Sequence, residues 1–147
     1  MSNKRFKKFS SKRKKARDDF QSTLVKASRA HSEGRLAEAE KGYLKVLKRR
    51  PDWGAVLNAL GTVYLDQAKL DKAKRVFTKA AKSTTPSIAA CYNLARLLQQ
   101  NNEHCTAIPI YQTILEEQPD NGEVWNNLGV AYRETGNQDE AISCYRK

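Results

Sequence analysis

The sequence has 147 residues, about the length of one domain, with 39% hydrophobic residues, 29% charged residues and a net charge of +11. A fully disordered chain has fewer apolar residues and a collagen-like chain has far more glycine, so both classes are excluded. The longest apolar run, Ile88–Tyr92, is too short for a membrane span of about 20 residues or for a secretory signal, so we expect a cytoplasmic protein with no transmembrane segment.

The positive charge is concentrated at the start of the chain. Residues 1–19 contain nine Lys or Arg and two Asp, whereas residues 88–147 contain four Lys or Arg and eight Asp or Glu. The basic runs within 4–17 alternate with Phe6 and Phe9 and could bind the phosphates of nucleic acid or an anionic surface. The same composition is typical of a solvated, disordered tail, which is what we expect for residues 1–19.

Residue types recur with a period of 34 through the rest of the chain. Three columns share this period: Leu60-Gly61, Leu94-Ala95 and Leu128-Gly129; Ala73, Ala107 and Ala141; and Phe77, Tyr111 and Tyr145. Because three independent columns agree, the sequence predicts one structural unit repeated along the chain. The copies span 20–53, 54–87, 88–121 and an incomplete 122–147.

Each copy is expected to form two antiparallel helices. In the second copy, apolar residues recur at spacings of three and four within 55–67 and again within 71–83, which places them on one face of each helix. The polar segment 67–70 forms the turn between them. The small residues Gly61, Ala95 and Gly129 allow the paired helix to approach closely, and Gly34 and Gly136 are placed to end a helix.

The fourth copy carries the fullest motif, Trp125-x2-Leu128-Gly129-x2-Tyr132 followed by Gly136 and Ala141-x3-Tyr145. This motif resembles the tetratricopeptide repeat family, whose period is 34 residues. The resemblance covers residues 20–147 and implies an all-α solenoid of antiparallel helix pairs, a superhelix of four repeats with the last truncated. Among members of the family, it is most similar to the repeat arm of bacterial O-linked N-acetylglucosamine transferase-like proteins.

The fourth copy lacks its last eight residues, so we expect this sequence to be a fragment of a longer protein. The edge left open would expose Trp125, Leu128 and Tyr145. In the second copy the proline that ends the repeat is displaced by one residue, to Pro86, which predicts a different junction with the third copy.

The resemblance also implies a peptide-binding groove lined by the first helix of each copy. Position 6 of the copies reads Val25, Ala59, Asn93 and Asn127, so two asparagines are predicted to form a ladder that grips a peptide backbone. The predicted groove residues are Asn93, Asn127, Arg96, Arg133, Tyr92 and Asn126. Arg96 and Arg133 could pair with an acidic side chain or a C-terminal carboxylate.

No catalytic motif is present in the sequence: it contains no glycine-rich phosphate loop, no HExxH and no GxSxG. The three cysteines have no metal-site spacing, and we expect no cofactor and no metal. The sequence therefore favours a non-enzymatic scaffold that binds a protein or an extended peptide. Two alternatives stay open: a substrate-recruiting arm of a glycosyltransferase or sulfotransferase whose catalytic part lies beyond residue 147, and a nucleic-acid-associated protein that acts through its basic tail.

Overall fold

The computed structural model describes residues 19–147, and these residues form α-helices joined by short turns. Among them, an isolated parallel bridge between Trp53 and Thr85 is the single β-type contact. The chain divides into two compact units, which end and begin at Pro51 and Asp52. The all-α fold of antiparallel helix pairs is confirmed within each unit.

The first unit contains one helix pair, a helical segment at 19–32 and α2 (Leu36–Arg49). Ala27 and Ala39 are fully buried between these helices, together with the ring of Tyr43. A Cβ atom at Gly42 would lie 2.6 Å from Cβ of Ala27, so the two helices meet where neither has bulk. This contact follows the predicted rule that small residues set the distance within a pair.

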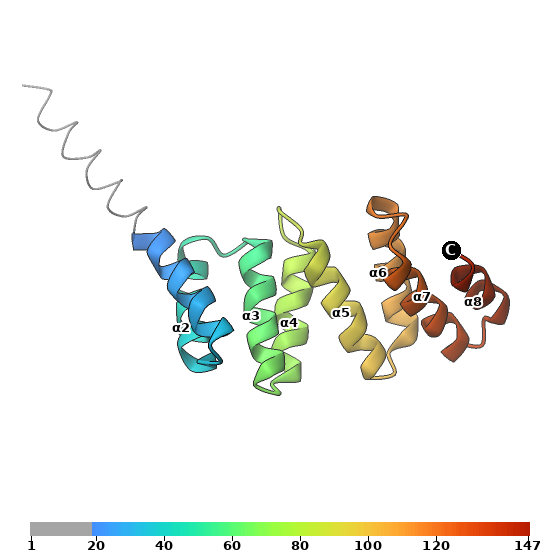
Figure 1. The fold of residues 1–147 in the computed structure, drawn as a ribbon, viewed down its shortest axis with the longest axis horizontal. Helices are drawn as coiled ribbons and strands as arrows, with labels where there is room; N and C mark the ends of the chain where they lie inside the picture. Colours follow the sequence, from blue (N-terminus) through green and yellow to red (C-terminus); the bar gives the residue numbers. More distant parts are fainter. Residues whose placement is uncertain (1–18) are drawn as a thin grey trace, which may run out of the picture. The chain divides into compact units, whose positions relative to one another are not determined.

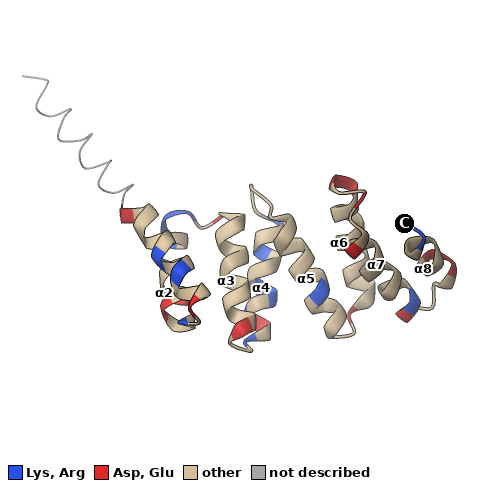
Figure 2. Ribbon diagram, viewed as in Figure 1, with Lys and Arg blue, Asp and Glu red and all other residues tan. Residues whose placement is uncertain are grey.

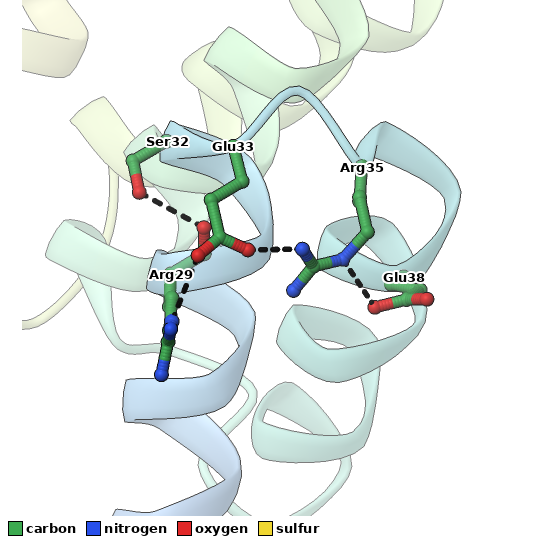
Figure 3. Close-up of polar contacts among 5 residues, drawn as sticks. All are labelled: Arg29, Ser32, Glu33, Arg35 and Glu38. Atoms are coloured by element: carbon green, nitrogen blue, oxygen red, sulfur yellow. Dashed lines mark hydrogen bonds and ion pairs between the residues drawn. The ribbon is translucent and has the colours of Figure 1, made fainter.

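Ion pairs surround the turn of this first pair (Figure 3). Nε of Arg29 lies 2.8 Å from Oε1 of Glu33, and Nε of Arg35 lies 2.9 Å from Oε2 of Glu38. Glu33 also pairs with Arg35, so one carboxylate joins the two sides of the turn. Hydrogen bonds from Arg29 and then from Arg35 lower the pKa of Glu33. These side chains are exposed, so salt screens their attraction.

The second unit contains three helix pairs, which follow one another along the unit in chain order (Figure 1). They are α3 (Gly54–Asp66) with α4 (Leu70–Ala81), α5 (Ile88–Gln100) with α6 (His104–Glu117), and α7 (Gly122–Glu134) with α8 (Gln138–Tyr145). The first helices of the pairs begin 34 residues apart, at 54, 88 and 122. The helices predicted at 55–67 and 71–83 are therefore confirmed as α3 and α4.

Two glycines set the spacing between the helices of a pair. A Cβ atom at Gly61 on α3 would lie 2.3 Å from the ring of Phe77 on α4. Likewise, a Cβ atom at Gly129 on α7 would lie 2.5 Å from the ring of Tyr145 on α8. Each aromatic ring thus occupies the place where a side chain of its partner helix would otherwise be, which confirms the predicted close approach.

The turns between paired helices share one backbone feature. Gly34 and Gly136 have φ angles of +73° and +83°, as their placement at a helix end predicts. Ala68 and Asn102 occupy the same position in the other two pairs and also have positive φ angles, +56° and +61°. The left-handed turn is therefore dictated by the helix pair, and two copies form it without glycine.

The junction between α4 and α5 differs from the other junctions between pairs. α4 has 12 residues, whereas α2 and α6 have 14 each, so a longer loop leads to α5. The backbone N–H of Thr84 in this loop donates to Oδ2 of Asp52 at 2.8 Å. A Cβ atom at Gly54 would lie 2.1 Å from the carbonyl oxygen of Thr85, so the loop packs directly on the start of α3.

One prediction about the last pair is wrong. Leu128 was expected on an exposed edge, but only 2% of its surface is accessible. α7 turns this residue toward α6 and α8, where it lies beside Leu115 and Cys144. Tyr145 is 45% exposed and Trp125 is half-buried, as expected for an edge.

Candidate functional site

The predicted groove residues of α5 lie on one helical face. At about 100° per residue, Tyr92, Asn93 and Arg96 fall within about 100° of one another around α5. Glu123 and Asn127 share a face of α7 in the same way. We call these residues of the two helices the α5–α7 face.

The phenol oxygen of Tyr92 connects α5 to α7. Its hydroxyl donates a hydrogen bond to the carboxylate of Glu123, and the same oxygen accepts a hydrogen bond from Nδ2 of Asn127 at 3.0 Å. Burial, followed by the hydrogen bond to Glu123, raises the pKa of Tyr92. The phenol therefore stays protonated at neutral pH and keeps its proton available for Glu123.

Two further groups surround the ring of Tyr92. The guanidinium carbon of Arg96 lies 5.7 Å from the ring centroid, within the range of a cation–π contact. The ring of Tyr111 meets that of Tyr92 edge-on, with 6.4 Å between the centroids. Tyr111 is fully buried, which raises its pKa far above its usual value, and its hydroxyl donates to Gln99 at 2.8 Å. We refer to Tyr92, Arg96, Glu123 and Asn127 as the Tyr92 cluster.

Asn93 makes the equivalent contact one pair earlier. Its Nδ2 atom donates to Oδ1 of Asn58 on α3 at 3.0 Å. In both cases position 6 of one copy donates to position 5 of the preceding copy, 35 residues earlier. The predicted asparagines therefore do not bond to each other; each one connects its helix to the previous first helix.

The remaining predicted residues stand apart from this cluster. Nη2 of Arg133 pairs with Oε1 of its neighbour Glu134 at 2.7 Å, which neutralises its charge locally and raises its pKa. Asn126 is exposed on α7. The structure thus brings together Tyr92, Arg96 and Asn127, and it pairs Asn93 with Asn58.

Sequence reasoning missed Asn58 and Glu123. Both lie at positions predicted to face the groove, but the search followed single columns spaced by 34 residues. Pairs offset by 35 residues, with a donor amide at position 6 and an acceptor at position 5, would have found both the Asn58–Asn93 and the Tyr92–Asn127 contacts. Glu123 carries no such signal, because its partner is set by how the phenol of Tyr92 points.

The arrangement offers complementary chemistry to a polypeptide. The hydrogen bonds of Asn93 and Asn127 use their Nδ2 atoms, and each carboxamide oxygen remains a possible acceptor for a backbone N–H. Arg96 is exposed, and no carboxylate within the described range 19–147 forms an ion pair with it. Its guanidinium can therefore accept a carboxylate ligand while it stays over the Tyr92 ring.

The basic segment 4–17 and most of the predicted disordered tail, residues 1–18 of 1–19, lie outside the described residues. Nucleic-acid or anionic-surface binding through this segment therefore stays a prediction. Within residues 19–147, no helix is long and apolar enough to cross a membrane.

Two family models match the chain, and both describe a tetratricopeptide repeat. One matches residues 55–84 and 88–121, and the other matches residues 110–143. Together they cover more than half of the chain and include α3 to α7.

Two curated proteins are similar in sequence over part of their length. The general transcriptional corepressor ssn6 of Schizosaccharomyces pombe is 33% identical over 91 residues, which is 62% of this chain and 8% of that protein. The anaphase-promoting complex subunit CDC16 of Saccharomyces cerevisiae is 29% identical over 116 residues, or 74% of this chain and 14% of that protein. The chain thus spans a small part of the curated relatives it matches.

Solved structures share the arrangement of helices. A crystal structure of MamA superposes with a TM-score of 0.79 at 19% identity, covering 94% of this chain and 81% of that one. A tetratricopeptide repeat protein from Parabacteroides merdae ATCC 43184 gives a TM-score of 0.79 at 26% identity, covering 88% and 52% of the two chains. These similarities support the fold, and the resemblance to the repeat arm of a transferase stays a prediction.

Proposed function

We propose that this chain, which belongs to the tetratricopeptide repeat family, is a protein-interaction scaffold that holds an extended peptide across the α5–α7 face. Tetratricopeptide repeats in the chain support a scaffold role. The peptide class and the residues that hold it are our proposal. In this proposal the peptide carries a carboxylate, either at its C-terminus or on an acidic side chain, close to Arg96.

Arg96 is the observation that carries the proposal. It is an exposed cation in the part of the chain with net negative charge, and its guanidinium rests over an aromatic ring. Arg133, the other predicted cation, already pairs with Glu134 and is a weaker candidate. A guanidinium that stacks on Tyr92 keeps its N–H groups available at its edge, where a carboxylate can form two parallel hydrogen bonds.

The asparagines supply the contacts to the peptide backbone in this proposal. Asn93 and Asn127 are each fixed by one hydrogen bond to the preceding first helix, so their orientation costs little entropy when a ligand binds. Each new hydrogen bond to a peptide N–H contributes about 0.5–1.5 kcal/mol. Two such bonds and a carboxylate contact suit a weak, exchangeable interaction that several repeats together would strengthen.

The test is an array of short peptides with either free or amidated C-termini, probed with the full chain. We expect captured peptides to share a carboxylate and to bind roughly tenfold more weakly to Arg96→Gln, since 1.4 kcal/mol corresponds to a factor of ten. Arg146→Gln is the matched control, because Arg146 is equally exposed but lies at the end of α8.

Three results separate the proposal from its rivals. Loss of binding in both Arg96→Gln and the double variant Asn93→Ala/Asn127→Ala supports it. Equal binding by the wild type and both variants contradicts the assignment of the site. Binding that disappears only when residues 1–17 are deleted assigns the function to the basic tail instead.

A further inference from the structure

A second cavity lies on the opposite side of α7 from the Tyr92 cluster. It has a volume of about 790 Å³ and is open to solvent between α6, α7 and α8. Trp125 lines it, and this residue lies about 200° around the helix from Asn127 of the Tyr92 cluster. A ligand of the α5–α7 face therefore leaves this cavity free, and we call it the α6–α8 pocket.

The floor of the α6–α8 pocket is apolar. Leu115, Leu128 and Cys144 contribute buried side chains to it. The ring of Trp125 is half-buried beside them, and its Nε1 donates to the carbonyl oxygen of Pro119 at 2.7 Å. Because this hydrogen bond fixes the indole, the ring provides a rigid apolar wall at low entropic cost.

The rim of the pocket is acidic. Glu116 on α6 and Asp139 and Glu140 on α8 line it, and they are exposed. Figure 2 shows these acidic segments in red on the two helices. No Lys or Arg belongs to the described residues that line the pocket. Three carboxylates around an apolar floor create a site that is complementary to a cation that carries an apolar group.

The aromatic wall already accepts a cation. The ammonium of Lys147 lies 6.0 Å from the centroid of the Trp125 ring, at the outer limit of a cation–π contact. A lysine or arginine from a partner can take this contact and an ion pair with the rim together. No other cavity lined by described residues combines an indole wall with three carboxylates.

We propose that the α6–α8 pocket binds a lysine- or arginine-rich segment of a partner protein and seats one large apolar side chain of that segment on its floor. The apolar side chain packs against Trp125 and Leu128, and the flanking cations face Glu116 and Glu140. This site is independent of the α5–α7 face, because it needs no carboxylate on the ligand. The scaffold would then hold two partners on opposite sides of α7.

The probe is the acetylated and amidated peptide Lys-Lys-Phe-Lys-Lys, titrated into the full chain while Trp fluorescence is recorded. A Trp53→Phe background leaves Trp125 as the reporter. We expect the peptide to shift the emission of Trp125 and to bind more weakly as salt is added. The peptide has no carboxylate, so it cannot make the proposed contact with Arg96.

Two variants test the rim and the floor separately. Glu116→Gln/Glu140→Gln removes two rim charges and should weaken binding roughly tenfold. Glu117→Gln is its matched control, because Glu117 is an exposed neighbour on α6 that does not line the pocket. Ser143→Trp places a ring in the pocket from an exposed position on α8 and should abolish binding, with helix content checked by circular dichroism.

Control peptides decide the ligand class. Replacing the Phe of the probe by Ala, or its Lys residues by Glu, should weaken or abolish binding. The proposal is overturned if Glu116→Gln/Glu140→Gln binds as tightly as Glu117→Gln, or if Ser143→Trp binds like the wild type. A neutral peptide that retains Phe and binds equally well would make the pocket a general apolar site, which also overturns it.

Discussion

The phenol oxygen of Tyr92 joins two helices of successive pairs through one atom. Tyr92→Phe keeps the ring under Arg96 but removes the hydrogen bonds to Glu123 and Asn127. We expect it to lower the free energy of unfolding at neutral pH by about 1 kcal/mol, measured by urea denaturation. Tyr145→Phe is the control, because the exposed ring of Tyr145 keeps its packing against Gly129.

The same residue predicts a pH dependence. Because the pKa of Tyr92 is raised in the folded state, its contribution to stability is fully present below about pH 10, the pKa of an unfolded tyrosine. The contribution is lost as the pH rises through the folded pKa. Urea denaturation between neutral and alkaline pH should therefore show a smaller decline in Tyr92→Phe than in the wild type. Equal declines would mean that Tyr92 titrates normally.

The left-handed turn at Ala68 is a site where glycine should stabilise the fold. A positive φ angle costs an alanine about 1–2 kcal/mol, and glycine adopts it freely. Part of this gain is offset because glycine loses more conformational entropy on folding. We expect Ala68→Gly to raise the melting temperature, whereas Ala59→Gly in the middle of α3 should lower it. A lower melting temperature for Ala68→Gly would contradict the assigned turn.

At the scale of helices, the close packing of α3 on α4 depends on the absence of a side chain at Gly61. Adding one methyl group there forces the ring of Phe77 away from its position, so Gly61→Ala should destabilise the chain by about 1–3 kcal/mol. Gly122→Ala makes the same chemical change at the start of α7, where a Cβ atom meets nothing within 4 Å. It should leave the melting temperature unchanged or slightly raised.

Most of the helix arrangement could be predicted because it follows from local rules that repeat. The period of 34 placed each pair, and the glycines at 61 and 129 indicated where the helices touch. The loop after α4 was harder to predict, since it depends on the approach of Thr85 to Gly54 from a different pair. Pro109 also lies inside α6, where an exposed position tolerates the missing N–H.

The candidate site could be predicted only in part. The choice of Tyr92, Asn93, Arg96 and Asn127 came from positions in the repeat, and the structure places them on one face. The direction of each asparagine could not be read from the sequence, because it depends on how far one first helix is shifted relative to the next. That shift pairs position 6 with position 5 and turns a predicted ladder into contacts between helices.

At the scale of the whole molecule, the charge is divided between a basic start and an acidic end. The two proposed sites lie in the acidic part and differ in what they attract: Arg96 attracts a carboxylate, and the α6–α8 pocket attracts a cation. Repeat folds suit this division of tasks, since each helix pair contacts mainly its neighbours and presents separate surfaces on its two sides.

The most direct measurement is a titration of the full chain, labelled with ¹⁵N, with a carboxylate-bearing peptide selected on the array. The account predicts that the side-chain amide signals of Asn93 and Asn127 and the backbone signals of α5 and α7 around Arg96 shift together, and that these shifts are lost in Arg96→Gln. Shifts confined to residues 1–18, or to helices other than α5 and α7, would contradict a peptide site at the Tyr92 cluster.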